Sequence, residues 1–215
     1  MILSDITNHE KEQMVRRAVE GAVVKDWETG FLNFSKVNQQ IDIRLNMYAA
    51  DLIVERCQRL DLNAVLGIPY SGIPLATLIA ERLDLPLMLS RKTTDRKIPG
   101  TWTRVFWPNA ESFTVGGRND FAINATCLEE KCRHVLLVDD VLGGGGTAVE
   151  FGKNLINEGL IPHVAVLVSK DFQGGFNKIT QLLGENPICA VRIESLSKPS
   201  NENLGRINLS GAYFR

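Results

Sequence analysis

Two acidic residues and four consecutive glycines follow one strongly apolar stretch of the chain. The apolar stretch occupies residues 134–138, and Asp139 and Asp140 come directly after it. Two apolar residues later come Gly143, Gly144, Gly145, Gly146 and Thr147. Consecutive glycines allow a backbone to approach a ligand closely, and free N–H groups at the start of a helix attract anions. The order strand, acids, glycine loop and helix therefore predicts a phosphate site, to which Thr147 adds a hydroxyl donor.

The two carboxylates indicate what the rest of the ligand is. They would repel a phosphate unless they bind something else, and the vicinal hydroxyls of a ribose can donate hydrogen bonds to both. The pattern thus favours a sugar phosphate, with Asp139 and Asp140 on the ribose and the glycine loop on its 5′-phosphate. The chain contains no GxxxxGK[ST] motif and no strand-GxGxxG unit, which disfavours a P-loop nucleotide site and a dinucleotide site.

The elements that position these residues follow an α/β rhythm. Short apolar runs predict strands at residues 64–68, 86–89, 134–138, 163–168 and 188–193. Amphipathic patterns predict helices at residues 5–26, 42–60, 75–83 and 147–158, with Asp42 as an N-cap and Gly159 as a C-terminal stop. Strands that alternate with helices imply a parallel sheet covered on both faces. Residues 91–125 break this rhythm, and we expect them to form a lid followed by an irregular hairpin.

The composition excludes several classes of function. The formal net charge of the 215 residues is -1, so no global positive field would recruit nucleic acid or an anionic membrane. No apolar run is long enough to span a bilayer, and the first residues lack the basic start and apolar stretch of a signal peptide. We therefore expect a cytoplasmic protein without nucleic-acid or membrane partners.

Residues 135–147 resemble the phosphoribosyl-pyrophosphate signature of the type I phosphoribosyltransferases. That signature is an apolar strand, two acids, two apolar residues and a small-residue loop that closes in Gly-Gly-Thr. The chain departs from it at Gly143 and Gly144, where the family often has threonine. The resemblance implies phosphoribosyl pyrophosphate as the ribosyl donor, Mg²⁺ held mainly by that donor, and a homodimer.

The resemblance also implies the family's fold, which is a Rossmann-like parallel sheet core with a small hood subdomain and a flexible lid loop. The whole chain, residues 1–215, would form one domain. Residues 41–170 would supply the core, and residues 1–40 together with segments after residue 170 would form the hood.

Two further segments fit the same family. Tyr70, Ser71 and Gly72 lie between a predicted strand and a predicted helix, where the family has its pyrophosphate loop and where backbone N–H groups suit an anion. Arg91 and Lys92 stand at the end of the second predicted strand, at the edge where α/β proteins bind ligands, and they would offset charge on the leaving pyrophosphate. The expected catalytic residues are therefore Asp139, Asp140, Arg91 and Lys92.

Two segments similar to the xanthine branch of the family indicate the base. Asn38 and Asp42 belong to a run similar to its Asn-x-Gln-x-Asp, and Lys170 and Phe172 belong to a run similar to its Lys-x-Phe-Gln. The resemblance implies that Asn38 and Lys170 face the nucleobase and that Phe172 stacks on it. It favours an oxopurine, which is xanthine, guanine or hypoxanthine.

Three alternatives to an oxopurine phosphoribosyltransferase have to be weighed. Residues 70–74 read Tyr-Ser-Gly-Ile-Pro, which is closer to the orotate phosphoribosyltransferases. A non-catalytic, ligand-sensing regulator on the same fold would need a DNA-binding domain, and the roughly 30 residues before the core are too few for one. A phosphatase or kinase with Asp139 as nucleophile would need a strand-DxDx pattern or a nucleotide loop, and the sequence has neither.

Overall fold

The structure is a computed structural model of the chain. It describes residues 6–34, 36–37, 40–93, 101, 104–106, 108–111, 118–126, 128, 133–200 and 205–211. Asn38 lies outside the described residues, as do residues 94–100, 102–103, 107 and 112–117 of the segment expected to form the lid and hairpin. Within the described part, no helix is both long and apolar enough to cross a membrane.

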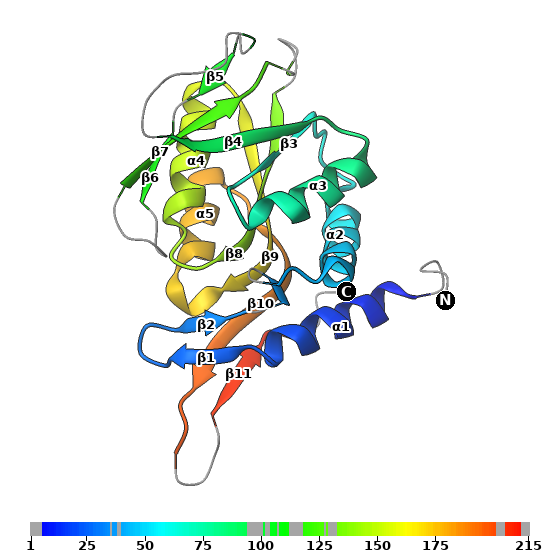
Figure 1. Cartoon of the computed structure of the whole chain (residues 1–215), viewed down its shortest axis with the longest axis vertical. Coiled ribbons are helices and arrows are strands. Elements are labelled where there is room, and N and C mark those ends of the chain that lie inside the picture. The colour runs from blue at the N-terminus through cyan, green and yellow to red at the C-terminus, as the bar shows by residue number, and fades with distance from the viewer. Residues whose placement is uncertain are drawn as a thin grey trace.

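A large sheet forms the centre of the molecule (Figure 1). In the described residues its strands are β3 (Ala64–Gly67), β4 (Leu87–Thr93), β5 (Val105–Phe106), β6 (Asn109–Glu111), β7 (Arg118–Asn124), β8 (His134–Leu142), β9 (Ile161–Lys170), β10 (Ile188–Ser197) and β11 (Arg206–Leu209). They follow the order β11-β10-β9-β8-β3-β4-β7-β5, and β6 pairs with β7 beside this path. The central strands from β10 to β4 are parallel, whereas the strands at both edges pair antiparallel.

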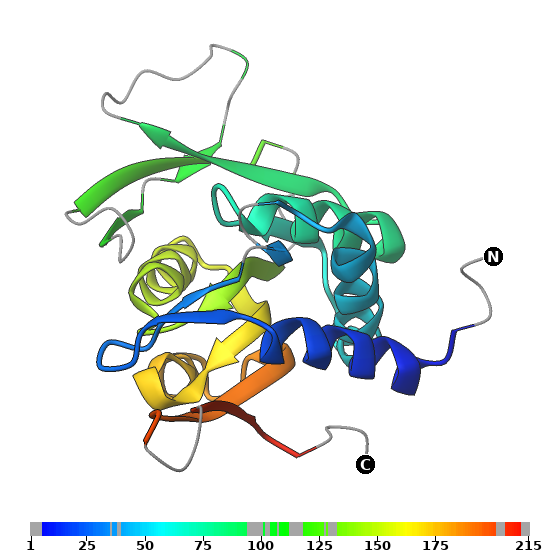
Figure 2. The same ribbon diagram turned by 60° about the horizontal axis from the view of Figure 1, so that its bottom comes forward.

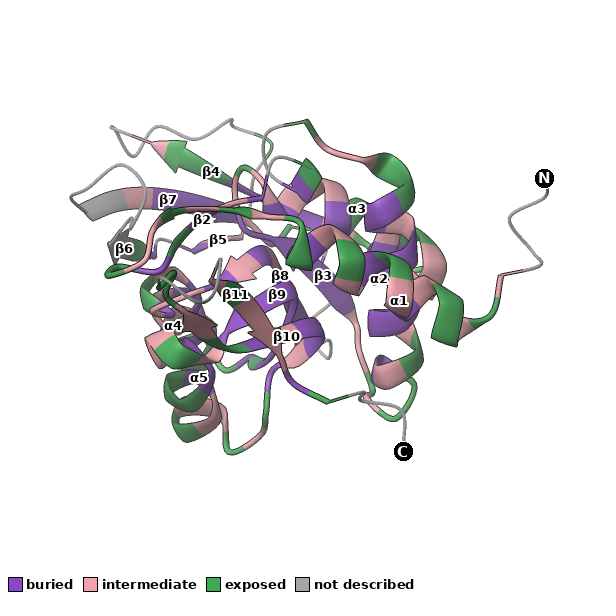
Figure 3. Ribbon diagram, turned by 90° about the horizontal axis from the view of Figure 1, so that it is seen from below, coloured by how far each residue is buried: buried purple, intermediate pink, exposed green. Residues whose placement is uncertain are grey.

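Helices cover both faces of the sheet (Figure 2). The helices α1 (Asn8–Glu20), α2 (Ile43–Cys57) and α3 (Gly72–Leu83) pack on one face, and α4 (Gly146–Asn157) and α5 (Gly175–Leu183) pack on the other. Alternate residues of β8 enter the two cores: Leu136 and Val138 join the first, and Val135 and Leu137 join the second. All four are fully buried, as Figure 3 shows for the central strands. The predicted fold class, a largely parallel α/β sheet, is confirmed.

The predicted strands are all present, and the predicted parallel alignment of residues 64–68 with residues 134–138 is confirmed by the β3–β8 pair. Asp42 is the N-cap of α2, since its carboxylate accepts a hydrogen bond from the N–H of Leu45 at 3.1 Å. The division of the chain into a core and a hood stays a prediction.

The predicted helix over residues 5–26 is wrong beyond Glu20. Gly21 ends α1, and the chain then forms a hairpin of β1 (Val23–Asp26) and β2 (Phe31–Asn33). The helix α5, the 3-10 helix η3 (Asp171–Gln173) and the edge strand β11 were not predicted. The strand β11 lies in a polar tail and forms because β10 offers it an edge to pair with.

The strand that carries the acids is longer than predicted. It does not end at Val138 but continues to Leu142, because β9 pairs with it over its whole length. Its other neighbour, β3, ends at Gly67 opposite Val138. The chain leaves these two neighbouring strands in opposite directions, through α3 to β4 and through α4 to β9. Such a switch point opens a crevice at the carboxyl ends of the strands, where α/β proteins bind ligands.

Candidate active site

Asp139 and Asp140 lie on the part of β8 that extends past the end of β3. Asp140 is buried and Asp139 is half-buried, and the backbone N–H of Asp140 donates to Oδ1 of Asp139 at 2.9 Å. Burial raises the pKa of the Asp139 carboxyl well above its usual range, and the nearby charge of Asp140 raises it further. Carboxylates withdrawn from water in this way are stabilised by ligand groups that donate hydrogen bonds, such as the hydroxyls of a sugar.

The turn after β3 lies against this acid pair. A Cβ on Gly72 would stand only 2.7 Å from the carbonyl oxygen of Val138 and 3.0 Å from Oδ1 of Asp139. Ser71 is at the N-cap position of α3, and Tyr70, which is 71% exposed, follows a cis peptide bond. The structure therefore brings the predicted pyrophosphate loop, Tyr70 to Gly72, next to Asp139 at one edge of the sheet.

The four glycines form the turn between β8 and α4. Gly145 has a φ of 78°, which favours glycine, and Gly146 is the first residue of α4. Gly175, at the start of α5, touches the turn: its N–H donates to the carbonyl oxygen of Gly143 at 2.9 Å. Thr147 is half-buried in the first turn of α4. The glycine loop thus adjoins two helix N-termini, an arrangement that favours a bound anion.

Lys170 ends β9 beside the glycine loop. Its side chain is buried, and its Nζ donates to the carbonyl oxygen of Gly30, in the β1–β2 turn, at 3.3 Å. A Cβ on Gly143 would stand 3.6 Å from this Nζ. Burial lowers the pKa of Lys170, whereas the charge of Asp140 acts in the opposite direction. The structure therefore brings Lys170 together with the glycine loop and the acids.

Phe172 follows in η3 and is 39% exposed. Its ring lies against Gly30, where an added Cβ would stand 2.4 Å from Cε2 of the ring. The preceding residue, Asp171, is fixed by Arg192, whose Nη2 lies 2.6 Å from Oδ2 of the carboxylate. The ring of Phe172 is thus held two residues after Lys170, close to the β1–β2 turn.

Arg91 and Lys92 lie within β4, which is longer than predicted, and both are exposed. They stand opposite Ala122 and Phe121 of β7. Adjacent side chains of a strand point to opposite faces, so the strand directs these two cations to different sides. A role for both at one ligand stays a prediction, as does the role of Asn38.

Two residues beside the glycine loop were not singled out from the sequence. Gln173 donates from Nε2 to the carbonyl oxygen of Thr29 at 2.7 Å, and its Oε1 is buried without a hydrogen-bond partner. Lys178 donates from Nζ to the carbonyl oxygen of Gly144 at 2.9 Å. Local sequence pattern hardly indicates these contacts, since only the adjacent glycines at 174 and 175 suggest a close backbone approach.

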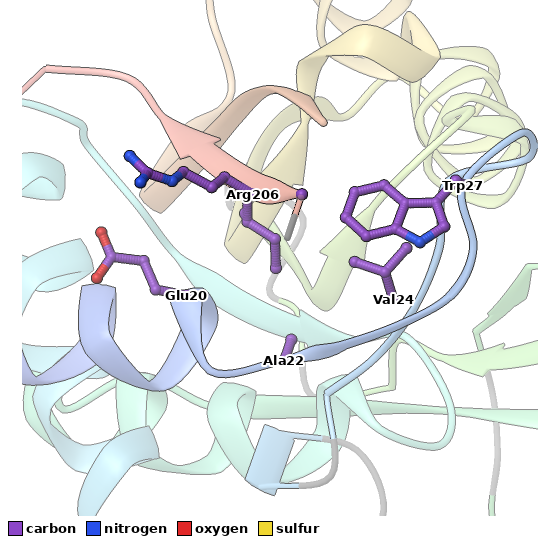
Figure 4. A pocket seen from close by; sticks show the side chains of 7 residues that line it. Glu20, Ala22, Val24, Trp27 and Arg206 are labelled. Atoms are coloured by element: carbon purple, nitrogen blue, oxygen red, sulfur yellow. The ribbon is translucent and has the colours of Figure 1, made fainter. Parts of the chain in front are cut away.

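A separate pocket of about 450 Å³ opens between the end of α1, the hairpin and β11 (Figure 4). Trp27 and Val24 stand on one side of it, and Glu20 and Arg206 on the other. None of the predicted site residues lines this pocket, so it is distinct from the crevice at the acids.

The residues present fit a metal ion that arrives with a phosphate ligand. Among the described residues, no group of three or more His, Cys, Asp or Glu could hold an ion. Asp139 and Asp140 offer oxygen atoms, which Mg²⁺ prefers, but two carboxylates leave most of its octahedral shell to other ligands and water.

Fold and site together define an α/β protein with an anion-binding glycine loop and an acid pair at the switch point of its sheet. The phosphoribosyl transferase domain family matches residues 38–175, more than half of the chain. The chain belongs to this family and is a phosphoribosyltransferase, which confirms the family predicted from the sequence.

The chain is also similar to curated proteins over most of its length. It is 28% identical to a xanthine phosphoribosyltransferase of Geobacillus thermodenitrificans, over 87% of this chain and 93% of that protein. It is 28% identical to a xanthine phosphoribosyltransferase of Macrococcus caseolyticus, over 93% of this chain and 97% of that protein.

Solved structures share the fold at low identity. The adenine phosphoribosyltransferase of Giardia lamblia, in complex with 9-deazaadenine, superposes with a TM-score of 0.67 at 18% identity, over 87% of this chain and 98% of the other. That of Trypanosoma brucei, in complex with AMP, pyrophosphate and ribose-5-phosphate, gives a TM-score of 0.62 at 20% identity, over 87% and 80% of the two chains. These likenesses support the fold.

Proposed function

We propose that this phosphoribosyltransferase moves the 5-phosphoribosyl group from phosphoribosyl pyrophosphate to an oxopurine, xanthine, guanine or hypoxanthine, and releases pyrophosphate. The observation that carries the choice of base is the buried ammonium of Lys170, whose pKa burial lowers. A base with exocyclic oxygens or a negative charge would stabilise that ammonium. Xanthine offers both, because it loses a proton near neutral pH. The similarity to xanthine phosphoribosyltransferases supports the same choice.

In this proposal the acids serve the ribose. Asp139 and Asp140 accept hydrogen bonds from its hydroxyls and stabilise the positive charge that develops at the anomeric carbon as pyrophosphate leaves. The glycine loop and Thr147 bind the 5′-phosphate through N–H and hydroxyl donors.

The remaining predicted residues serve the leaving group and the base. The loop from Tyr70 to Gly72 binds the pyrophosphate, and Arg91 and Lys92 offset its charge. Mg²⁺, held mainly by the donor, would add further positive charge there. Asn38 and Phe172 would contact the base, and a homodimer in the cytoplasm remains part of the proposal.

Orotate is the second candidate base, since residues 70–74 read Tyr-Ser-Gly-Ile-Pro and orotate is itself an anion that Lys170 could stabilise. A substrate panel separates the two. Adenine, hypoxanthine, guanine, xanthine, orotate and uracil would each be assayed for pyrophosphate release with phosphoribosyl pyrophosphate and Mg²⁺. We expect turnover with an oxopurine, and turnover with orotate alone would overturn the proposed base. If no base reacts but a purine raises the melting temperature, a ligand-sensing role is favoured instead.

A further inference from the structure

The back of the glycine loop is tied to α5 by two hydrogen bonds. The carbonyl oxygen of Gly143 accepts from the N–H of Gly175 at 2.9 Å, and the carbonyl oxygen of Gly144 accepts from Nζ of Lys178 at 2.9 Å. The contact is close: a Cβ on Gly175 would stand 2.1 Å from the carbonyl oxygen of Gly143. The two segments are far apart in sequence, since Gly144 and Lys178 are 34 positions apart.

These bonds determine which way the loop N–H groups point. A trans peptide unit is planar, and its N–H points away from its C=O. Both peptide units are trans, since the cis bond of the described residues precedes Tyr70. With the carbonyls of Gly143 and Gly144 bound to α5, the N–H groups of Gly144 and Gly145 point away from α5. Within the described part of the chain neither N–H donates to a protein acceptor, so both remain available for an anion.

We propose that Lys178 is a positioning residue for the 5′-phosphate. Its ammonium, on an exposed side chain in the first turn of α5, binds the carbonyl of Gly144 and thereby holds the N–H of Gly145 toward the phosphate. Without this bond the carbonyl of Gly144 loses its partner among the described residues, and the peptide unit can rotate on its Gly144 side, where a side chain would meet no described atom within 4 Å; its Gly145 side stays packed against Gly175. A rotated unit would direct a carbonyl oxygen at the phosphate and repel it.

The inference rests on the proposed assignment of the glycine loop to the 5′-phosphate, and it concerns one half of the donor. Ribose 5-phosphate should occupy the glycine loop, whereas pyrophosphate should occupy the separate loop from Tyr70 to Gly72. Loss of Lys178 should therefore weaken the first ligand and leave the second unchanged.

The test compares Lys178→Met and Lys178→Arg with a matched control, Lys153→Met. Lys153 is an exposed lysine on α4 that pairs with Glu150 at 3.0 Å and has no contact with the loop. Calorimetric titration would measure the affinity of each variant for ribose 5-phosphate and for pyrophosphate with Mg²⁺. We expect Lys178→Met to weaken ribose 5-phosphate binding about fivefold to tenfold, which is less than for a buried charge-assisted hydrogen bond because Lys178 is exposed and acts through the loop backbone, and to leave pyrophosphate binding unchanged. Lys178→Arg, which keeps a donor, should retain most of the affinity.

Steady-state kinetics gives the second measurement. Lys178→Met should raise KM for phosphoribosyl pyrophosphate by a similar factor and leave kcat within about twofold, because the bond serves binding in both ground and transition states. The loss of affinity for ribose 5-phosphate should persist at about 0.5 M salt, where a long-range charge effect would be screened. The proposal is overturned if Lys178→Met behaves like Lys153→Met, if both ligands weaken equally, or if salt abolishes the difference. Failure of ribose 5-phosphate to bind the unaltered protein would instead contradict the assignment of the glycine loop itself.

Discussion

Gly72 and Asp139 are in direct contact across the switch point of the sheet: a Cβ on Gly72 would stand 2.8 Å from the Cα of Asp139 and 3.0 Å from its Oδ1. The loop expected to bind pyrophosphate and the acid expected to bind ribose are therefore adjacent in the crevice. The two halves of the proposed donor would meet there, at the anomeric carbon.

Gly72→Ala should disturb both halves of the site. The added methyl would be forced against the backbone of Val138 and Asp139, which cannot move without shifting β8. We expect a loss of about 1–3 kcal/mol in the free energy of unfolding and a rise of at least about tenfold in KM for phosphoribosyl pyrophosphate. Denaturant titration and kinetics would measure these effects.

Gly211→Ala is the matched control, since a Cβ at Gly211 meets no atom of the described residues within 4 Å. It should change neither quantity. If both variants gave the same free energy of unfolding and the same KM, the contact between Gly72 and Asp139 would contribute to neither stability nor donor binding.

Asp139→Asn should make the protein more stable and less active. Burial and the charge of Asp140 raise the pKa of Asp139, so the folded protein binds this proton more tightly than the unfolded chain does. The free energy of unfolding therefore falls as the pH rises from the ordinary aspartate pKa through the raised one. Asparagine removes this loss and can still accept from the N–H of residue 140. We expect a melting temperature roughly 2–4 °C higher at about pH 8, with a smaller difference as the pH falls through the raised pKa.

Two comparisons check this interpretation. Asp171→Asn removes a carboxylate that Arg192 stabilises, and it should lower the melting temperature at the same pH.

The double variant of Asp139 and Asp140 to Asn should cut turnover by about a hundredfold or more, because both charges face the developing positive centre in the proposed mechanism. A melting temperature of Asp139→Asn below that of the unaltered protein at every pH would contradict the cost assigned to this charge.

The sequence was sufficient to predict the parts of this protein that depend on local pattern. The five apolar strands, the N-cap Asp42 and the acid–glycine motif all follow from short-range periodicity and residue type. It was not sufficient for elements that depend on a distant partner. The hairpin of β1 and β2 replaces the end of a predicted helix, and β11 forms only against β10.

The same distinction separates the residues of the site. Asp139 and the turn at Gly72 meet because the neighbouring parallel strands β3 and β8 end at one edge of the sheet, where α/β proteins bind ligands. The contacts of Gln173 and Lys178 with the glycine loop arise from η3 and α5, which the sequence did not predict. Long-range backbone contacts of this kind leave only glycine as a local sign.

Lys170→Met should change the use of the base more than the use of the donor. Methionine keeps the length and apolar stem of lysine but removes the buried charge. We expect KM for the preferred oxopurine to rise about tenfold to a hundredfold, as for a lost charge-assisted hydrogen bond, and KM for phosphoribosyl pyrophosphate to change by less than about threefold. Initial rates with each substrate varied in turn would measure this, with Lys153→Met as the control. A larger effect on the donor than on the base would remove Lys170 from the base site.

The departure from threonine at Gly143 and Gly144 should have different consequences at the two positions. A Cβ on Gly143 would stand 2.6 Å from Oε1 of Gln173, whereas a Cβ on Gly144 would meet nothing within 4 Å. Moving the amide of Gln173 away would break the hydrogen bond from its Nε2 to the carbonyl oxygen of Thr29, and flipping it would set two acceptors against each other. Gly143→Thr should therefore lower the free energy of unfolding by about 1–3 kcal/mol, and Gly144→Thr should be tolerated.

If the clash with Gln173 is the cause, Gln173→Ala should relieve it. The double variant of Gly143→Thr and Gln173→Ala should then be more stable than the sum of the single effects predicts. A double-mutant cycle by denaturant unfolding measures this coupling. Strict additivity would mean that some other contact keeps glycine at position 143.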